Sequence, residues 1–443
     1  QPSHSKIITG HETPGVVSWA LGQNITSLVA CNHSKIEPYC VIWDYETNNQ
    51  QDKRERQKVK KIVKASLCCL ILTVFLLSSS SWSTAAKPPA PHGQMILEAV
   101  RITGPVTFCG ETVPLDNPDV RERLERELVI ALDSSDSIIM WLKRSNRYFP
   151  EIEKMLRALN LPDDLKYIAI AESSLRTQAY SPKGAAGYWQ FIEGTGMKYG
   201  LQITNNIDER RNLQRATGAA LAYLSDLYAL FNSWTLAAAA YNMGEDGLGG
   251  EILVQQVNDY YRLHLNQETS RYVFRILAAK IILSNPARFG YAPLSHDLYH
   301  PVTADTVEIK TERSVPLHII AQAAKTYFKV IKDLNPQLTR YHLPAGTYLI
   351  QIPRGAADGF SQRFETLEKQ WAAQKDKYIY TVQKGDTLTG IAARFNVPVR
   401  ALLIWNEITA AKKITPGEKL CIFTKASQTA ISPDNSGVYP VTD

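Results

Sequence analysis

The stretch ESSLRTQAYSPKGAAGYWQF, residues 172–191, joins one carboxyl to a turn-rich segment and guides the interpretation of the whole chain. Glu172 follows Leu165 by seven residues and Ile168 by four, so on a helix its carboxyl faces the protein. Burial disfavours the ionised form and raises the pKa of a carboxyl, which can then donate a proton to a leaving oxygen near neutral pH. The alternative is a helix-end glutamate that reaches solvent or caps the helix.

The residues after Glu172 have the composition of a binding loop. Ser-Pro-Lys-Gly at 181–184 is turn chemistry, and Gly184 and Gly187 allow close approach of the backbone beside a cleft. Ser181 and Gln190 supply neutral polar contacts, and we expect Trp189 to offer an aromatic face to a sugar ring.

The acidic residues around this stretch limit the possible chemistry. No Asp or Glu lies between Glu172 and Glu193. Glycosidases that hydrolyse their substrate need a second carboxylate opposite the first. A single carboxyl therefore favours a reaction whose nucleophile belongs to the substrate. Glu193 is the alternative second carboxylate, although we expect it to be an exposed residue at a helix start.

Three further blocks accompany this stretch: LPDDLKY at 161–167, AAYNMG at 239–244 and ETSRYV at 268–273. Together they resemble the soluble-lytic-transglycosylase catalytic domain, and the layout is similar to the membrane-bound lytic murein transglycosylase D type. The resemblance implies a mainly α, goose-lysozyme-like domain. It also implies cleavage of the β-1,4 bond between N-acetylmuramic acid and N-acetylglucosamine of peptidoglycan without water, leaving 1,6-anhydromuramoyl ends.

On this resemblance Glu172 acts as acid and then as base, and no cofactor is needed. Substrate contacts fall to five further residues: Ser181, Gln190, Tyr241, Asn242 and Tyr272. Tyr272 corresponds to the tyrosine that hydrogen-bonds the catalytic carboxyl, and Tyr241 packs beside Asn242. The alternatives are an Asn242 that only ends its helix and a Tyr272 that only packs against its neighbours.

Apolar spacing predicts that residues 118–295 are mostly helical. We expect one helix over 119–143, another beginning near Pro150, and further helices over 212–231 and 267–283. Two C-terminal segments, 305–355 and 378–424, repeat at an offset of 71, with Asn335 matching Asn406 and Gly346 matching Gly417. Each is expected to be a small α+β unit in the order strand–helix–helix–strand.

The second repeat contains YTVQKGDTL at 380–388 and resembles a LysM module. The resemblance implies that Gly385, Asp386 and Thr387 bind chains containing N-acetylglucosamine. The first repeat has Glu312-Arg-Ser-Val315 in place of Gly-Asp-Thr and so resembles a degenerate LysM module. It is either a second sugar-binding module or a spacer packed on the catalytic domain.

The N-terminal region carries a targeting pattern. Seven basic residues within 53–64 precede the apolar run 65–77 and a small-residue stretch, which is typical of a secretory signal. We interpret 59–86 as a signal peptide or N-terminal anchor, 1–58 as an upstream extension of doubtful status, 87–117 as a linker and 425–443 as a flexible tail. The expected location is the cell envelope, periplasmic, with possible membrane association through the N-terminal segment.

Composition excludes several other classes. The chain has 443 residues, 44% hydrophobic and 21% charged, with a net charge of +6, which is ordinary for globular domains and weak for a nucleic-acid binder. The six cysteines form no CxxC pair, and His296 and His300 lack a third ligand, so no metal is expected. The rival functions are a hydrolytic muramidase and a non-catalytic LysM protein that binds peptidoglycan.

Overall fold

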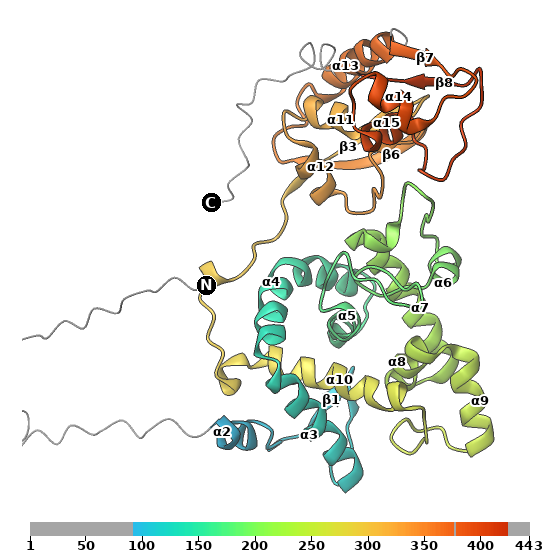
Figure 1. The fold of residues 1–443 in the computed structure, drawn as a ribbon. Coiled ribbons are helices and arrows are strands. Elements are labelled where there is room, and N and C mark those ends of the chain that lie inside the picture. Colours follow the sequence, from blue (N-terminus) through green and yellow to red (C-terminus); the bar gives the residue numbers. More distant parts are fainter. Residues whose placement is uncertain (1–91, 376–377, 424–443) are drawn as a thin grey trace, which may run out of the picture. The chain divides into compact units, whose positions relative to one another are not determined.

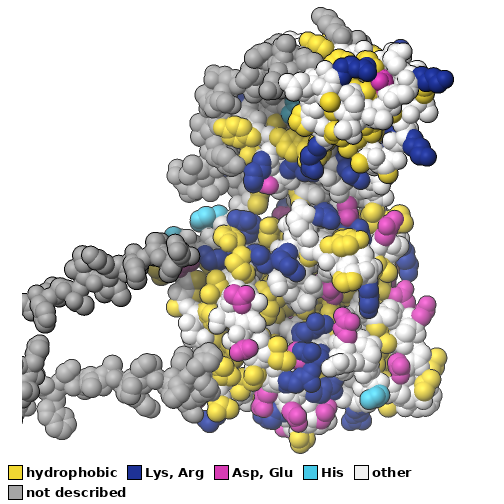
Figure 2. Space-filling model, viewed as in Figure 1, with side chains coloured by type: hydrophobic (Ala, Val, Ile, Leu, Met, Phe, Trp, Pro, Cys, Tyr) yellow, Lys and Arg dark blue, Asp and Glu magenta, His cyan; other side chains and the backbone are white. Residues whose placement is uncertain are grey.

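The computed structural model describes residues 92–375 and 378–423. The predicted upstream extension, signal or anchor, and tail (1–58, 59–86 and 425–443) lie outside the described residues. Within the described ranges, no helix is both long enough and apolar enough to cross a membrane. On the face drawn in Figure 2, basic side chains are interspersed with acidic ones over the helical part.

Residues 92–297 are predominantly helical (Figure 1). A short hairpin of β1 (Thr107–Phe108) and β2 (Glu111–Thr112) precedes the long helices. The helices are α2 (His92–Ala99), α3 (Pro118–Asp133), α4 (Ser135–Ala158), η1 (Asp163–Leu165), α5 (Lys166–Ser173), α6 (Glu193–Lys198), η2 (Glu209–Arg211), α7 (Leu213–Phe231), α8 (Trp234–Met243), α9 (Glu245–Gln255), α10 (Gln267–Ser284), η3 (Pro286–Phe289) and η4 (Ser295–Asp297). The short helix α5 packs between α4 and α10, so its residues lie in the core of the domain.

Capping residues fix where the helices begin. Asn117 accepts a hydrogen bond from the backbone of Asp119 at the start of α3, and Asn212 accepts one from Arg215 at the start of α7. The expected helices over 212–231 and 267–283 are confirmed within one residue at each end. These caps fix the helix ends, while the buried stripes of α7 and α10 hold the helices in the core.

Two predictions about helix boundaries are wrong. The expected helix over 119–143 is two helices, because Ser134 has non-helical dihedral angles (φ −102°, ψ 68°) between α3 and α4. Pro150 lies inside α4 rather than at a helix start. The helix continues through the proline because its apolar face is buried on both sides, including Phe149 and Ile152.

The structure differs from the expected linker over 87–117. Phe108 and Val113 are buried in the core of the helical domain. The carboxylate of Glu111 accepts hydrogen bonds at the start of α8, from the amide and hydroxyl of Thr235 at 3.1 and 3.0 Å and from the Ser233 hydroxyl at 3.0 Å. The hairpin therefore supplies the cap of a core helix.

Both C-terminal segments have the predicted strand–helix–helix–strand order. In the first module, residues 304–353, the outer strands pair antiparallel and enclose two helices. In the second module, residues 378–423, the same order recurs with shorter strands. The first contains β3 (Ala304–Thr311), β4 (Val315–Pro316), α11 (Leu317–Ala323), α12 (Phe328–Leu334), β5 (His342–Leu343) and β6 (Gly346–Pro353), with α13 (Phe360–Lys375) packed on it; the second contains β7 (Ile379–Thr381), α14 (Leu388–Arg394), α15 (Val399–Trp405) and β8 (Lys419–Cys421).

The repeated asparagine does the same work in both modules. The Asn335 side chain donates to the carbonyls of Ile331 and Gln351, at 2.9 and 2.6 Å, and accepts from the Gln351 amide at 2.8 Å. Asn406 makes the matching bonds to Leu402 and Cys421, at 2.9, 2.8 and 2.6 Å. Each asparagine thus joins the end of the second helix to the last strand, which gives the sequence repeat a structural basis.

Candidate active site

Glu172 lies in the last turn of α5, on the face that packs against the domain. The helix ends at Ser174 and Leu175, which both have left-handed backbone conformations (φ 52° and 56°). Ile168, one turn earlier, is fully buried, and the Glu172 residue is half-buried. The predicted apolar stripe therefore does carry this carboxyl toward the protein.

Tyr272 of α10 meets the carboxyl directly. The residue is only 1% exposed, and its hydroxyl donates a hydrogen bond to Oε1 of Glu172. Burial raises the pKa of Glu172 to about 7, against the lowering effects of the Tyr272 hydrogen bond and the positive charge of Arg275. The negative charge of Glu268 adds to the increase in this pKa. A carboxyl in this setting exchanges its proton near neutral pH.

Tyr241 of α8 forms a second side of the site. Its hydroxyl donates to the carbonyl of Trp189 at 2.8 Å, and its ring contacts Phe191 and Tyr223 with centroid distances of 6.0 and 5.3 Å. Burial and the nearby Glu172 charge raise the pKa of Tyr241 well above its usual range. Tyr241 therefore stays a neutral phenol beside the carboxyl, and its hydrogen bond positions the 181–191 segment.

The segment 181–191, which we call the cleft loop, folds on itself through its polar side chains. Oγ of Ser181 accepts a hydrogen bond from the Ala185 amide at 3.0 Å. Gln190 has a positive φ of 49°, and its side chain donates to the Gly187 carbonyl at 2.8 Å. These bonds fix where the two predicted contact residues stand, so the loop has a defined shape before any ligand arrives.

The prediction that Trp189 offers its face to a sugar is wrong. The side chain is fully buried in the domain core, and its indole donates to Thr217 at 3.0 Å. Gly187 and the bridge between Ala186 and Phe191 turn the chain here, which directs the indole inward. An indole in a turn-rich segment fits either environment, so the sequence alone does not distinguish core packing from ligand contact.

Asn242, the other predicted contact residue of α8, connects two helices. Its Oδ1 accepts a hydrogen bond from the Thr269 hydroxyl at 2.8 Å, and Thr269 also accepts one from the side chain of Asn266, the N-cap of α10. This contact joins the C-terminal end of α8 to the first turn of α10. Tyr272 lies on the same helix, three residues after Thr269. Asn242 therefore aligns the two helices that supply Tyr241 and Tyr272.

Other candidates lie apart from this arrangement. Glu193 is the exposed first residue of α6, as expected. Across residues 92–375 and 378–423, no group of three or more His, Cys, Asp or Glu side chains could hold a metal ion.

The Gly-Asp-Thr turn of the second module is held by its own side chains. The Asp386 carboxylate accepts hydrogen bonds from the Tyr380 hydroxyl at 2.6 Å and the Gln383 amide at 2.8 Å, which with Arg394 lower its pKa. Thr387 caps α14 by accepting from the Gly390 amide at 3.0 Å, and Gly385 has φ +89°. The side chains of these residues hold the turn in shape, and the turn exposes its backbone to the outside.

Two charged residues near Glu172 were not predicted. Glu268 and Arg275 both act on the pKa of Glu172, in opposite directions. They stand four residues before and three after Tyr272, which is the spacing of one helical face. That spacing was a usable signal once Tyr272 had been assigned to the site.

Two segments of the chain match known domain families. Residues 150–258 match the transglycosylase SLT domain, and residues 380–423 match the LysM domain. The membrane-bound lytic murein transglycosylase D of Escherichia coli is 29% identical over 345 residues, 75% of this chain and 75% of that protein. The SLT domain and the similarity to a lytic murein transglycosylase support a lytic transglycosylase enzyme.

Two other known proteins are similar to parts of this chain. The peptidoglycan transglycosylase gp16 of Escherichia phage T7 is 38% identical over 93 residues, which are 20% of this chain and 7% of the phage protein. A crystal structure of the lytic transglycosylase Slt from Pseudomonas aeruginosa overlaps 35% of this chain and 26% of that chain, with 20% identity and a TM-score of 0.25. The SLT match contains Glu172, the cleft loop and Tyr241, while Tyr272 lies beyond its last residue.

Proposed function

We propose that this transglycosylase cleaves the β-1,4 bond between N-acetylmuramic acid and N-acetylglucosamine in peptidoglycan without water. Glu172 protonates the leaving O4 oxygen as the bond from C1 to O4 breaks. The resulting carboxylate then takes the proton of the muramyl C6 hydroxyl, and O6 closes on C1. The products are a 1,6-anhydromuramoyl end and a free N-acetylglucosamine end, and the enzyme regains its proton.

The single observation that carries this proposal is the environment of Glu172. One carboxyl with its pKa raised to about 7 can give up a proton and take one back at the same pH. The Tyr272 hydroxyl, bonded to Oε1, keeps the carboxyl oriented through both steps. Tyr241 is a neutral neighbour that brings no competing charge to the first step.

The proposal assigns substrate contacts to five residues. Ser181 and Gln190 stand on the cleft loop, Tyr241 and Asn242 at the end of α8, and Tyr272 on α10. Because their polar atoms already have partners within the protein, we expect them to fix the shape of the cleft and to make shared hydrogen bonds with the sugar.

Product mass tests the chemistry. We expect muropeptides released from purified sacculi to carry anhydromuramoyl ends, each one water lighter than the hydrolysed equivalent. The hydrolytic alternative draws support from Glu268, a second carboxylate close enough to act on Glu172. The muramidase reaction would be established instead if the wild type released only hydrated reducing ends and the Glu268→Gln variant no longer released them.

A Glu172→Gln variant separates catalysis from binding. We expect it to sediment with sacculi as the wild type does and to release no soluble muropeptides. Glu193→Gln is the matched control, because Glu193 is an exposed acid outside the site, and it should keep full activity. Unchanged release by Glu172→Gln would contradict the catalytic role of Glu172.

We also propose that the second module retains the enzyme on its polymer. Gly385, Asp386 and Thr387 form the turn that presents backbone groups to N-acetylglucosamine units. A peptidoglycan substrate supports a location in the cell envelope, and we propose the periplasmic side, with the N-terminal segment as signal or membrane anchor. Sedimentation of the Asp386→Ala protein with sacculi tests the binding role, and a clear loss relative to Lys384→Ala is expected.

A further inference from the structure

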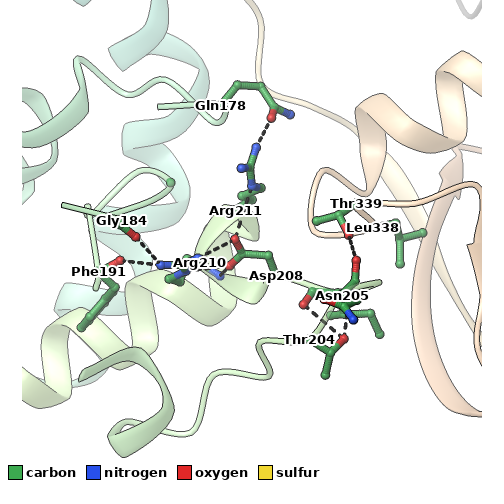
Figure 3. A network of polar contacts seen from close by, with 12 residues as sticks. Gln178, Gly184, Phe191, Thr204, Asn205, Asp208, Arg210, Arg211, Leu338 and Thr339 are labelled. Carbon is green, nitrogen blue, oxygen red and sulfur yellow. Dashed lines mark hydrogen bonds and ion pairs between the residues drawn. The ribbon is translucent and has the colours of Figure 1, made fainter. Parts of the chain in front are cut away.

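Arg210, a buried arginine, is one of the residues that hold the cleft loop to the rest of the protein, and it contacts the loop at two carbonyls. Nη1 of Arg210 donates to the carbonyls of Gly184 and Phe191, at 2.8 and 3.0 Å (Figure 3). These two carbonyls lie toward opposite ends of the cleft loop, and Ser181 and Gln190 lie within four residues of them. A single guanidinium thus links two separate carbonyls of the loop and adds to its backbone hydrogen bonds, such as the one from the Ala186 amide to the Phe191 carbonyl at 3.0 Å.

Arg210 is itself held by Asp208. Nε and Nη2 of Arg210 donate to the two carboxylate oxygens at 2.8 and 2.9 Å, and both side chains are less than 10% exposed. This fork geometry leaves Nη1 aimed at the loop, which a lysine could not reproduce. The contact is also close at the backbone, because a Cβ on Gly187 would lie 1.7 Å from the Arg210 carbonyl oxygen.

The first module supports the segment that carries this pair. The Asp208 amide donates to the Gln337 carbonyl at 2.8 Å, and the Thr339 amide donates to the Asn206 carbonyl at 2.9 Å. Between them, Ile207 and Leu338 form an isolated antiparallel bridge, and the Ile207 side chain belongs to the buried core of the first module. The Thr339 hydroxyl adds a bond to the Asn205 carbonyl at 2.7 Å (Figure 3).

We infer that Arg210 is a positioning residue for the cleft loop and that residues 337–340 of the first module hold its Asp208 partner in place. The first module then serves the catalytic site as a structural support. This chain of contacts does not include Glu172, because the residues that act on its pKa, Tyr272, Arg275 and Glu268, stand on α10. The inference rests on the proposed function only in taking the cleft loop as a substrate-contacting segment, because the contacts themselves exist without substrate.

The experiment compares hydrogen–deuterium exchange in the full-length wild type, Arg210→Lys and Arg262→Lys. Arg262 is the matched control because it is 77% exposed and pairs with Asp259 at the surface. We expect amides of the cleft loop to exchange at least about tenfold faster in Arg210→Lys, while those of α5 and α10 keep wild-type rates. Wild-type exchange throughout the cleft loop would overturn the inference, and so would uniformly faster exchange across the domain.

A second variant tests the contribution of the first module. Thr339→Ala with Arg340→Ala removes two side-chain bonds to the Asn205 carbonyl and changes only exposed residues, so the module keeps its core. We expect faster exchange at 204–209 and, several-fold, in the cleft loop. Faster exchange at 204–209 with an unchanged cleft loop would overturn the supporting role of the module.

Kinetics on peptidoglycan distinguish positioning from a direct catalytic effect. Arg210→Lys should lower kcat/KM mainly through KM, and the pH at which activity falls should stay where it is in the wild type. A displaced pH profile would mean that Arg210 acts on Glu172 itself and would overturn the inference. An inactive wild type would contradict the proposed function, while the exchange result would still decide the structural inference.

Discussion

Glu172→Gln should make the protein more stable at alkaline pH while it abolishes activity. The folded protein raises the pKa of Glu172 from its ordinary 4.5 to about 7, so the native state binds this proton more tightly than the unfolded chain. Wild-type stability therefore falls as pH rises from 4.5 to 7, and the loss is complete above that. Glutamine cannot ionise and is still able to accept the Tyr272 hydrogen bond.

The two pKa values set the size of the effect. At 1.36 kcal/mol per pKa unit, an increase from 4.5 to about 7 corresponds to an upper limit of about 3 kcal/mol. Partial exposure of Glu172 reduces this, and we expect about 2 kcal/mol at pH 8. For a helical domain of this size, that is a Tm increase of about 4–8 °C.

Thermal unfolding followed by circular dichroism at pH 5 and pH 8 measures the effect. The Tm of Glu172→Gln should exceed that of the wild type by several degrees at pH 8 and by much less at pH 5. Glu193→Gln, which changes an exposed carboxyl, should show no such pH dependence. A Tm difference that is the same at both pH values would refute the raised pKa of Glu172.

Three further predictions concern the Glu172 site, Gly187 of the cleft loop and Asn406 of the second module. Tyr272→Phe removes a bond that lowers the pKa of Glu172, so the pH at which kcat/KM falls should rise, whereas Glu268→Gln removes a negative charge and should lower it; pH–rate profiles that move together would contradict this assignment. Gly187→Ala should cost more than about 3 kcal/mol in chemical denaturation, because its Cβ would meet the Arg210 carbonyl oxygen, while Gly249→Ala in α9 meets nothing and should stabilise by up to about 1 kcal/mol. Asn406→Ala should unfold the second module alone, since each buried partner left unpaired costs about 1–3 kcal/mol; protection lost equally from the helical domain in hydrogen exchange would show that the modules do not fold separately.

The sequence predicted best where one element determines its own environment. The stripe of Leu165 and Ile168 was enough to direct Glu172 inward, because helical periodicity is local. The equivalence of Asn335 and Asn406 was apparent from the repeat at an offset of 71 residues, and the structure shows that both make the same hydrogen bonds. These features depend on residues close together in the chain.

Long-range contacts were beyond what local patterns can indicate. Glu111 caps a helix more than 120 residues further along the chain. No local pattern indicates such a contact, and the segment that contains Glu111 was therefore interpreted as a linker. Trp189 was assigned to the ligand because indole burial depends on which face a turn presents to the core. Arg210 stood in an ordinary charged run, and only its carbonyl partners at Gly184 and Phe191 distinguish it.

The place of Ile207 also bears on how such proteins can be recombined. This side chain completes the core of the first module although it precedes that module by almost a hundred residues. A gene rearrangement that removes or exchanges the first module would expose Ile207 and leave the carbonyl of Asn206 without its partner. Among the described residues, the buried core of the second module comes from residues 382–422, so its removal would take no core partner from the helical domain. Two repeats of similar shape therefore differ in how freely evolution can shuffle them.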